Sequence, residues 1–309
     1  MPSPEVAGSL LADFGQSLYD AGYARTRYVH AILAVADAQR AWRRNLQEAW
    51  DVVGAWELHE PGSNRVPLPQ VAFAAGVAVA LAWEWYEFAN FLILSWASAG
   101  RPGEILALTR RALVLPSDLG QTDDVAYVVF EEPKTGRQTQ LRHAARRQHA
   151  RVDAVEAVAW LEAICRGLHE SAPMVDLTYA ELRAAWQAVF GERLGFSTTH
   201  LTGVTPASVR AGAATALYRS RESAEPVRWQ LRHTSQRMTE RYIQESVAAL
   251  VLGRLPSASR HTIAQLADAA PALLSEATDR ARSGPLRQPR PDAAPRAPRR
   301  GARGHHAAE

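Results

Sequence analysis

The sequence predicts a mainly α-helical protein with one small antiparallel β-sheet, which is an α+β fold. Apolar residues recur at helical spacing over most of the chain between residues 5 and 279. Two short runs instead concentrate strand-forming residues, Leu113–Leu115 and Ala126–Phe130. The chain has 309 residues, of which 47% are hydrophobic, so it can bury one large core or two modest ones.

The first 60 residues are predicted to form a small helical domain. Apolar side chains at helical spacing fall into three groups, at 10–18, 28–36 and 42–53, and therefore predict three helices. The prolines and glycine that follow interrupt any helix, so residues 61–69 are predicted to be a linker. Residues 70–99 carry a dense aromatic stripe, which is typical of one or two buried helices.

A helix start and a hairpin are predicted next. In Arg101-Pro102-Gly103-Glu104, proline suits the first helical position and an acidic residue suits the third, which leaves Arg101 at the cap with its side chain free. Thr135-Gly136 predicts a hairpin turn after the second strand, with a return strand that includes Thr139 and Leu141.

The remainder of the chain is again helical in pattern. Residues 70–256 are predicted to form the second domain, and residues 257–279 a C-terminal helix that is kinked or split at Pro271. This helix could dock on a neighbouring subunit or fold back on its own chain. Residues 280–309, rich in arginine, proline and alanine, are predicted to be disordered.

The positive charge of the chain belongs to this tail. Residues 280–309 contain eight Arg and two acidic residues, which leaves 27 basic and 30 acidic residues in 1–279. The net charge therefore does not predict nucleic-acid binding by the folded part, because it is the local distribution that attracts a polyanion. The local candidates are two arginine-rich stretches, at 40–44 and 137–151.

Composition excludes several classes of protein. The single cysteine, Cys165, excludes an intrachain disulfide and predicts a reducing intracellular compartment, the nucleus or the cytoplasm. The most apolar stretch, 71–83, is too short to span a membrane. His143 and His149 lie six residues apart, which is no metal-ligand spacing, and a glycine-rich phosphate loop is missing from the sequence.

The polar residues that remain as candidates are Arg101, Lys134, Arg210, His233 and Tyr242. Singly, each has a structural explanation. Arg101 could pair with Glu104, Arg210 could lie on a solvated helix face, and Tyr242 could be a packing residue. Lys134 is distinctive, because the chain contains 34 Arg and no other Lys. An ammonium can act as a proton donor where a guanidinium, with its pKa above about 12, is a poor one.

Together these residues resemble the tyrosine recombinase (phage integrase) family. The first arginine lies in Gly100–Leu106, followed three places on by Glu, and Lys134 lies in the predicted hairpin. Thr205–Arg210 is similar to the helix start with the family's second arginine. Leu231-Arg232-His233-Thr234-Ser235 is followed by Tyr242, nine residues after the histidine. The resemblance covers roughly residues 70–250.

The resemblance implies an integrase-like catalytic domain at 70–256 and a core-binding-like helical domain at 1–60. Tyr242 would attack a DNA phosphodiester, Arg101 and Arg210 would contact the phosphate oxygens, Lys134 would protonate the leaving oxygen, and His233 would be a further catalytic residue. The reaction needs no metal, ATP or other cofactor. The implied partners are double-stranded DNA and further copies of the chain, as a tetramer on paired sites, with no membrane. The resemblance also implies a role in DNA integration and an origin in a mobile element.

Two positions depart from the family pattern. Ala207 stands three places before Arg210, where the family usually has histidine, and a methyl group can neither donate to phosphate nor accept a proton. His200 in the preceding loop is a candidate substitute. Arg232 stands where the family often has glycine, and its added cation could restore a phosphate contact.

Three hypotheses therefore remain from the sequence. The first is a site-specific DNA recombinase. The second is a recombinase-fold DNA-binding protein that has lost catalysis through Ala207. The third is a helical interaction protein whose motif matches are accidental, in which case the five side chains would lie apart in the folded chain.

Overall fold

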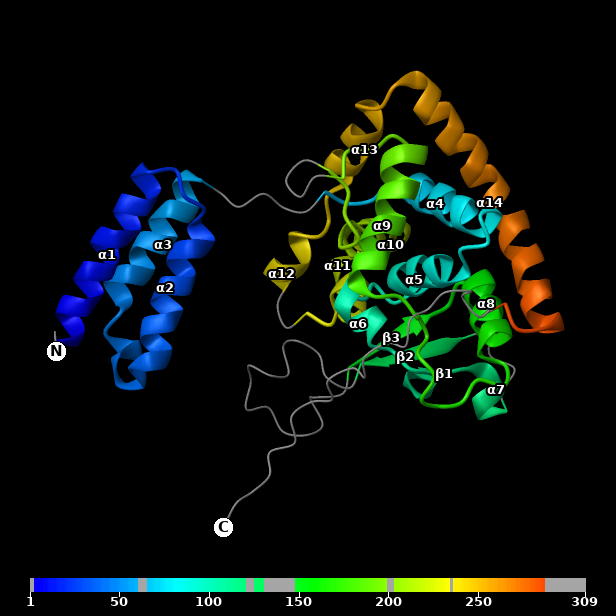
Figure 1. The fold of residues 1–309 in the computed structure, drawn as a ribbon, viewed down its shortest axis with the longest axis horizontal. Coiled ribbons are helices and arrows are strands. Elements are labelled where there is room, and N and C mark those ends of the chain that lie inside the picture. The colour runs from blue at the N-terminus through cyan, green and yellow to red at the C-terminus, as the bar shows by residue number, and fades with distance from the viewer. Residues whose placement is uncertain are drawn as a thin grey trace, which may run out of the picture. The chain divides into compact units, whose positions relative to one another are not determined.

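The computed structural model describes residues 3–60, 66–120, 125–130, 148–198, 203–233 and 236–286. The chain divides into two compact units, residues 1–64 and 65–309, which we describe separately. Both units are dominated by helices, and the second holds one three-stranded antiparallel sheet (Figure 1). The predicted fold class, mainly α with a small antiparallel sheet, is confirmed.

The first unit packs three α-helices around a small aromatic core. Its helices are α1 (Pro4–Asp20), α2 (Arg25–Ala38) and α3 (Gln47–His59), with the short 3-10 helix η1 (Arg40–Arg44) between the last two. Tyr28 and Ile32 are fully buried, and the Tyr28 hydroxyl donates to the Ala49 carbonyl at 3.0 Å. Gly15 lies directly against the Tyr28 ring, where a Cβ atom would clash.

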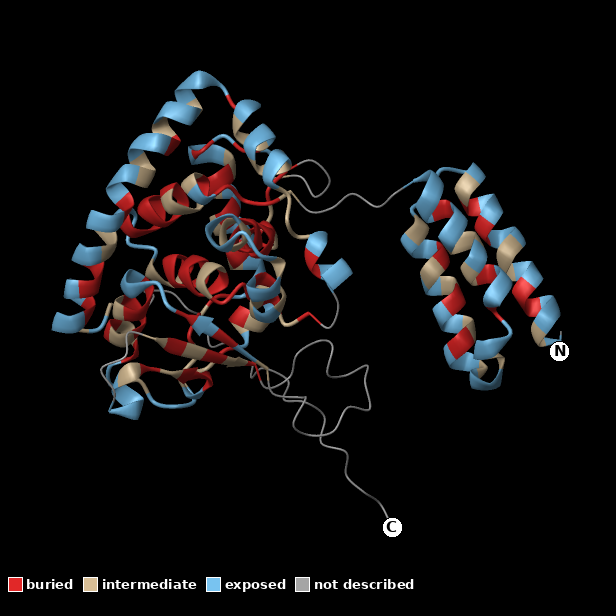
Figure 2. Ribbon diagram, turned by 180° about the vertical axis from the view of Figure 1, so that it is seen from behind, coloured by how far each residue is buried: buried red, intermediate tan, exposed pale blue. Residues whose placement is uncertain are grey.

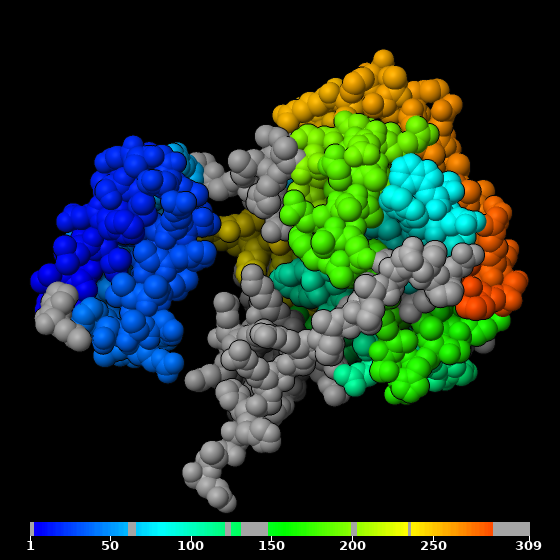
Figure 3. Space-filling model, viewed as in Figure 1, coloured from blue at the N-terminus to red at the C-terminus, as the bar shows by residue number. Residues whose placement is uncertain are grey.

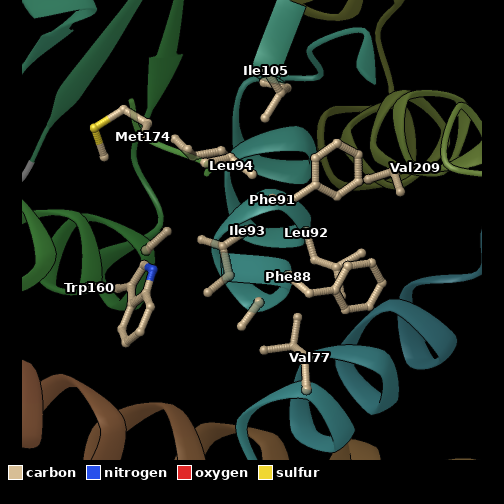
Figure 4. Packing of buried hydrophobic residues seen from close by; sticks show 14 of the residues in the cluster. Val77, Phe88, Phe91, Leu92, Ile93, Leu94, Ile105, Trp160, Met174 and Val209 are labelled. Atoms are coloured by element: carbon tan, nitrogen blue, oxygen red, sulfur yellow. The ribbon is translucent and has the colours of Figure 1, made fainter. Parts of the chain in front are cut away.

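The core of the second unit surrounds the helix α5 (Tyr86–Ala97). The helix α5 follows α4 (Gln70–Ala82). Both helices are apolar on nearly all sides, as expected for helices enclosed by other elements. Figure 4 shows Phe88, Phe91 and their neighbours on α5 between Trp160 on one side and Val77 and Val209 on others. The rigid end of α5 leads directly to residues 98–101, where the first candidate site residue lies.

The sheet has the strand order β1-β2-β3. Its strands are β1 (Leu113–Val114), β2 (Ala126–Phe130) and β3 (Gln148–Val152), and Val128 pairs with Leu113 on one side and Ala150 on the other. The short helices α6 (Pro102–Leu106), η2 (Arg110–Ala112) and α7 (Pro116–Leu119) flank β1. Alternate residues of β2 and β3 are buried, so one face of the sheet covers the core.

The second strand is confirmed, but β3 differs from the predicted return strand. Thr139 and Leu141, with the turn at Thr135-Gly136, lie outside the described residues. The observed partner of β2 instead begins at Gln148, inside the stretch that the sequence marked only as arginine-rich. Only Ala150 and Val152 in this strand are apolar and buried, so the alternation was too short to stand out.

Helices complete the second unit after the sheet. These are α8 (Val155–Cys165), α9 (Tyr179–Trp186) with the π-helical extension η5 (Gln187–Arg193), α10 (Ser208–Arg221), α11 (Ala224–Leu231), α12 (Gln236–Glu240), α13 (Glu245–Gly253) and α14 (Ser257–Ser283). Cys165 is buried at the end of α8, where it acts as a small core residue. Within the described residues, no helix has the length and apolar character that a membrane crossing requires.

The helix α14 settles one expectation and corrects another. It is not split at Pro271, one of the two alternatives that the sequence left open there, and it continues to Ser283, inside the segment predicted to be disordered. It packs against α4 and α8 of its own chain, forming an outer edge of the unit (Figures 1 and 3). Three of its buried residues, Ile263, Ala270 and Ala277, lie seven residues apart, and Figure 2 shows much of its remaining surface exposed. This packing stabilises the helix despite the missing amide hydrogen of Pro271.

Candidate functional site

Arg101 and Glu104 begin the helix α6 as the sequence predicted. Arg101 is the N-cap, Pro102 the first helical residue and Glu104 the third, and the Glu104 carboxylate accepts the Arg101 backbone N–H at 3.0 Å. The Arg101 side chain is not free, because its Nη1 atom donates to Glu104 Oε1 at 2.6 Å. About a quarter of the side chain is exposed, at 26%, so it is accessible in part to a ligand.

Arg210 is buried near the start of α10, and the solvated-face alternative for it is wrong. Only 2% of its surface is exposed, and its guanidinium donates to the carbonyls of Ala99 and Leu231, the latter at 2.6 Å. Burial, and next the charge of Arg101, lower its pKa, but a guanidinium remains charged at neutral pH. Among the described residues, its Nε atom is buried and has no acceptor.

His233 is a buried neutral imidazole that faces Arg210. Its Nε2 atom lies 3.2 Å from Arg210 Nη2, and its Nδ1 atom lies 3.2 Å from the Thr239 hydroxyl. Since a guanidinium can only donate, Nε2 must be the acceptor and Nδ1 carries the proton. Burial, together with the charges of Arg210, Arg101 and Arg232, lowers the pKa of His233 to about 4. The imidazole is therefore uncharged at neutral pH.

Tyr242 lies between α12 and α13, against the same pair. Its ring centroid is 5.1 Å from that of His233, and the Arg210 Cζ atom is 5.5 Å from the Tyr242 ring. Its backbone is held by Thr215, whose hydroxyl donates to the Tyr242 carbonyl at 3.0 Å. The ring is half-buried in a small apolar cluster. Tyr242 is therefore a packing residue that also contacts Arg210.

The structure thus brings together four of the five residues selected from sequence. Arg210, His233 and Tyr242 are in direct proximity, and Arg101 is near enough for its charge to lower the pKa of both Arg210 and His233. Lys134 lies outside the described residues, as does His200. The convergence argues against accidental motif matches, since residues from four separate segments meet at one place.

Sequence reasoning missed two members of this cluster. Thr239, fully buried on α12, orients the His233 ring, and no motif marked it. The pairing of Glu104 with Arg101, at 2.6 Å, was expected, but its second ion pair, with Arg232 at 2.8 Å, was not. The charges of both arginines, and the Arg101 backbone N–H, lower the pKa of Glu104 although its burial acts in the opposite direction. Its carboxylate is therefore ionised.

Comparison with known proteins finds similar structures but no similar sequence. No protein-family model matches the sequence, and no curated protein matches it. The crystal structure of XerA recombinase is similar to this chain. The two share 14% sequence identity over 81% of this chain and 92% of that one, with a TM-score of 0.44.

The cluster has the charge of an anion-binding site. Three guanidinium groups, of Arg101, Arg210 and Arg232, face one carboxylate, and the imidazole beside them is neutral. The excess positive charge suits a phosphate, whose oxygens match paired guanidinium donors. In the part of the chain that the structure describes, no cluster of three or more histidine, cysteine or carboxylate side chains could hold a metal ion. Tyr242 borders this site, and its phenol is a group of a type that attacks phosphorus.

Proposed function

We propose that this protein is a DNA strand-transfer enzyme of the tyrosine recombinase type. It cleaves and rejoins double-stranded DNA through a 3′-phosphotyrosyl intermediate on Tyr242. The observation that carries the proposal is the convergence of Arg210, His233 and Tyr242, with distances of 3.2 Å from Arg210 Nη2 to His233 Nε2 and 5.1 Å between the His233 and Tyr242 rings. A structural role alone does not require a buried arginine beside a neutral histidine and a phenol.

The chemistry balances without a cofactor. The Tyr242 oxygen forms a bond to phosphorus while the bond from phosphorus to the 5′ oxygen of DNA breaks. Arg101 and Arg210 offset the charge that develops on the non-bridging oxygens, and Lys134 donates a proton to the leaving 5′ oxygen. The phosphotyrosyl ester keeps the energy of the broken bond, so a 5′ hydroxyl can reverse the reaction and reseal a strand.

The state of His233 changes when DNA binds. In the free protein, the arginine charges and burial hold its pKa near 4, so it is a weak base. A bound phosphate brings negative charge next to the same arginines and thereby raises the pKa of His233. When Arg210 Nη2 turns from Nε2 to the phosphate, Nε2 is free to accept the phenolic proton as Tyr242 attacks. The Thr239 hydroxyl fixes the tautomer that this step requires.

The DNA partner and the assembly belong to the same proposal. The substrate is duplex DNA held mainly through its phosphates, and the active form is a tetramer on paired sites. Exposed arginines of η1 in the first unit, Arg40, Arg43 and Arg44, supply one basic patch. Arg43 is partly committed to the protein, because its Nε atom donates to the Ala36 carbonyl at 3.1 Å.

A second candidate function rests on Ala207. This residue is the N-cap of α10, three places before Arg210, and its methyl group supplies neither a donor nor a proton acceptor to the site. The loss of one acid-base group costs about 10²- to 10⁴-fold in rate. The alternative is therefore a recombinase-fold protein that binds DNA and does not cleave it.

The experiment uses nicked duplexes drawn from a pool of sequences, on which cleavage releases a short strand and traps the covalent product. We expect a protein–DNA adduct that survives denaturation and is lost in Tyr242→Phe. The matched control is Tyr218→Phe, which removes the hydroxyl of another half-buried tyrosine in the same apolar cluster and keeps the adduct. DNA binding with no adduct supports the second candidate, and an adduct that persists in Tyr242→Phe refutes the first.

A further inference from the structure

Arg232 occupies a backbone conformation that disfavours any residue with a Cβ atom. It ends α11 with φ 58° and ψ 40°, in the left-handed region where glycine is the usual residue. It also directly precedes His233. An arginine at this position therefore has to be explained by what its side chain contacts.

The Arg232 side chain is buried and its terminal nitrogens are committed to protein groups. Only 4% of the side chain is exposed. Its Nη2 atom donates to Glu104 Oε2 at 2.8 Å, and its Nη1 atom donates to the carbonyls of Ser98 and Gln230 at 3.2 and 3.3 Å. The guanidinium also lies over the Phe130 ring, with Cζ 3.9 Å from its centroid. Both Nη atoms are thus bonded to protein groups and the side chain is almost fully buried, which argues against a direct contact with DNA.

Two arginines hold the segment that leads to Arg101. Arg232 donates to the carbonyl of Ser98, and Arg210 donates to the carbonyl of Ala99, the next residue. Ala99 itself has φ 47°, again in the left-handed region, so this turn depends on its neighbours to persist. The turn after α5 is thus held by side chains of two other segments, one that contains Arg210 and one that contains Arg232 and His233.

Glu104 connects Arg232 to Arg101 in the proposed phosphate site. Its Oε2 atom accepts from both the Arg101 backbone and Arg232, while Oε1 accepts from Arg101 Nη1. If Arg232 were absent, Arg101 alone would have to balance a carboxylate that is only 10% exposed. Arg232 therefore neutralises Glu104 and leaves the other donors of Arg101 for a phosphate.

We propose that Arg232 is a positioning residue of the reaction proposed above. It holds the Glu104 carboxylate in place. Glu104 in turn holds the Arg101 guanidinium in the correct position relative to His233 and Tyr242. Arg232 also contacts Phe130, the last residue of β2, so it packs against the strand that precedes Lys134 in the sequence. The inference rests on the proposed function, but the geometry that it requires can be measured without DNA.

The test compares Arg232→Met with the double variant Arg232→Met/Glu104→Gln in adduct formation on nicked DNA. Misplacement of Arg101 by about 1 Å predicts a rate loss of about 10²-fold in the single variant, with duplex affinity nearly unchanged. The double variant has no carboxylate to neutralise, so it recovers part of the rate. A direct phosphate contact by Arg232 predicts no recovery and would overturn the proposal.

Two further variants separate positioning from folding. Arg232→Gly suits the left-handed backbone, so it keeps the fold if Arg232→Met does not, and it is expected to show the same rate loss and the same recovery with Glu104→Gln. The control is Arg228→Met, which breaks an Arg–Glu pair on the same helix at the surface, with Glu225 at 2.6 Å, and leaves the cleavage rate unchanged.

A measurement on DNA-free protein distinguishes failure of this proposal from failure of the proposed function. NMR titration of the His233 ring reports the charges around it. We expect the His233 pKa to rise in Arg232→Met, because a neighbouring cation is removed, and to return toward the wild-type value in the double variant. An unchanged His233 pKa in Arg232→Met contradicts the placement of Arg232, whether or not the wild type cleaves DNA. Wild-type protein that forms no adduct, with the expected titration, refutes the function alone.

Discussion

Acidification should destabilise the second unit through His233. The imidazole has a pKa of about 4 in the folded protein, against about 6.5 in an unfolded chain, because burial and three arginine charges oppose its protonation. Above about pH 6.5 both states hold the neutral ring, so His233 contributes no pH dependence there. Below that pH the unfolded state binds a proton that the folded state does not, and stability falls until about pH 4. Linkage gives a loss of about 2 kcal/mol between about pH 7.5 and pH 5.

The assay is urea unfolding of the wild type and of His233→Gln at both pH values. The amide of Gln can still accept from Arg210 but does not titrate in this range. Since the other ionisable groups are common to both proteins, their effects cancel in the difference between the two pH dependences. We expect the wild type to lose about 2 kcal/mol more than the variant on acidification. Equal losses in the two proteins would refute the placement of a neutral His233 beside the arginines.

Three other changes test the site and its support. Lys134→Arg keeps the charge but removes the proton donor, so adduct formation in rapid-quench assays should slow by about 10²- to 10⁴-fold, and an unchanged rate removes Lys134 from the role of acid. Ala207→His restores the missing donor at the start of α10 and should accelerate cleavage by about 10-fold or more; no gain would show that the site does not use this position. Gly212→Ala places a Cβ atom against the Leu68 carbonyl, and should lower the free energy of unfolding by about 1–3 kcal/mol in urea, with Gly253→Ala, which meets open space, as the control.

The sequence was informative where local rules decide the structure. Proline and glutamate after Arg101 marked the start of α6, and the run Ala126–Phe130 marked β2, because capping and strand preference act within a few residues. The helical fold class followed from hydrophobic periodicity in the same way. Local rules did not determine β3, whose five residues carry only two buried apolar side chains.

The sequence was less informative where distant contacts decide. Nothing local indicates that Arg210 is 2% exposed, because its acceptors, Ala99 and Leu231, lie far away in the chain. The same holds for Arg232, whose partner Glu104 precedes it by 128 residues. The continuity of α14 through Pro271 likewise depends on its packing against α4 and α8. Tertiary contacts outweighed local preference in each case.

The central claim is that Tyr242 becomes covalently bonded to DNA. Digestion of the trapped adduct with protease and nuclease, followed by mass spectrometry of the nucleotide-linked peptide, identifies the bonded residue directly. We expect a single linked peptide with the nucleotide on Tyr242 through a 3′ phosphate. A linkage to any other residue, or to the 5′ end of the DNA, would contradict the mechanism.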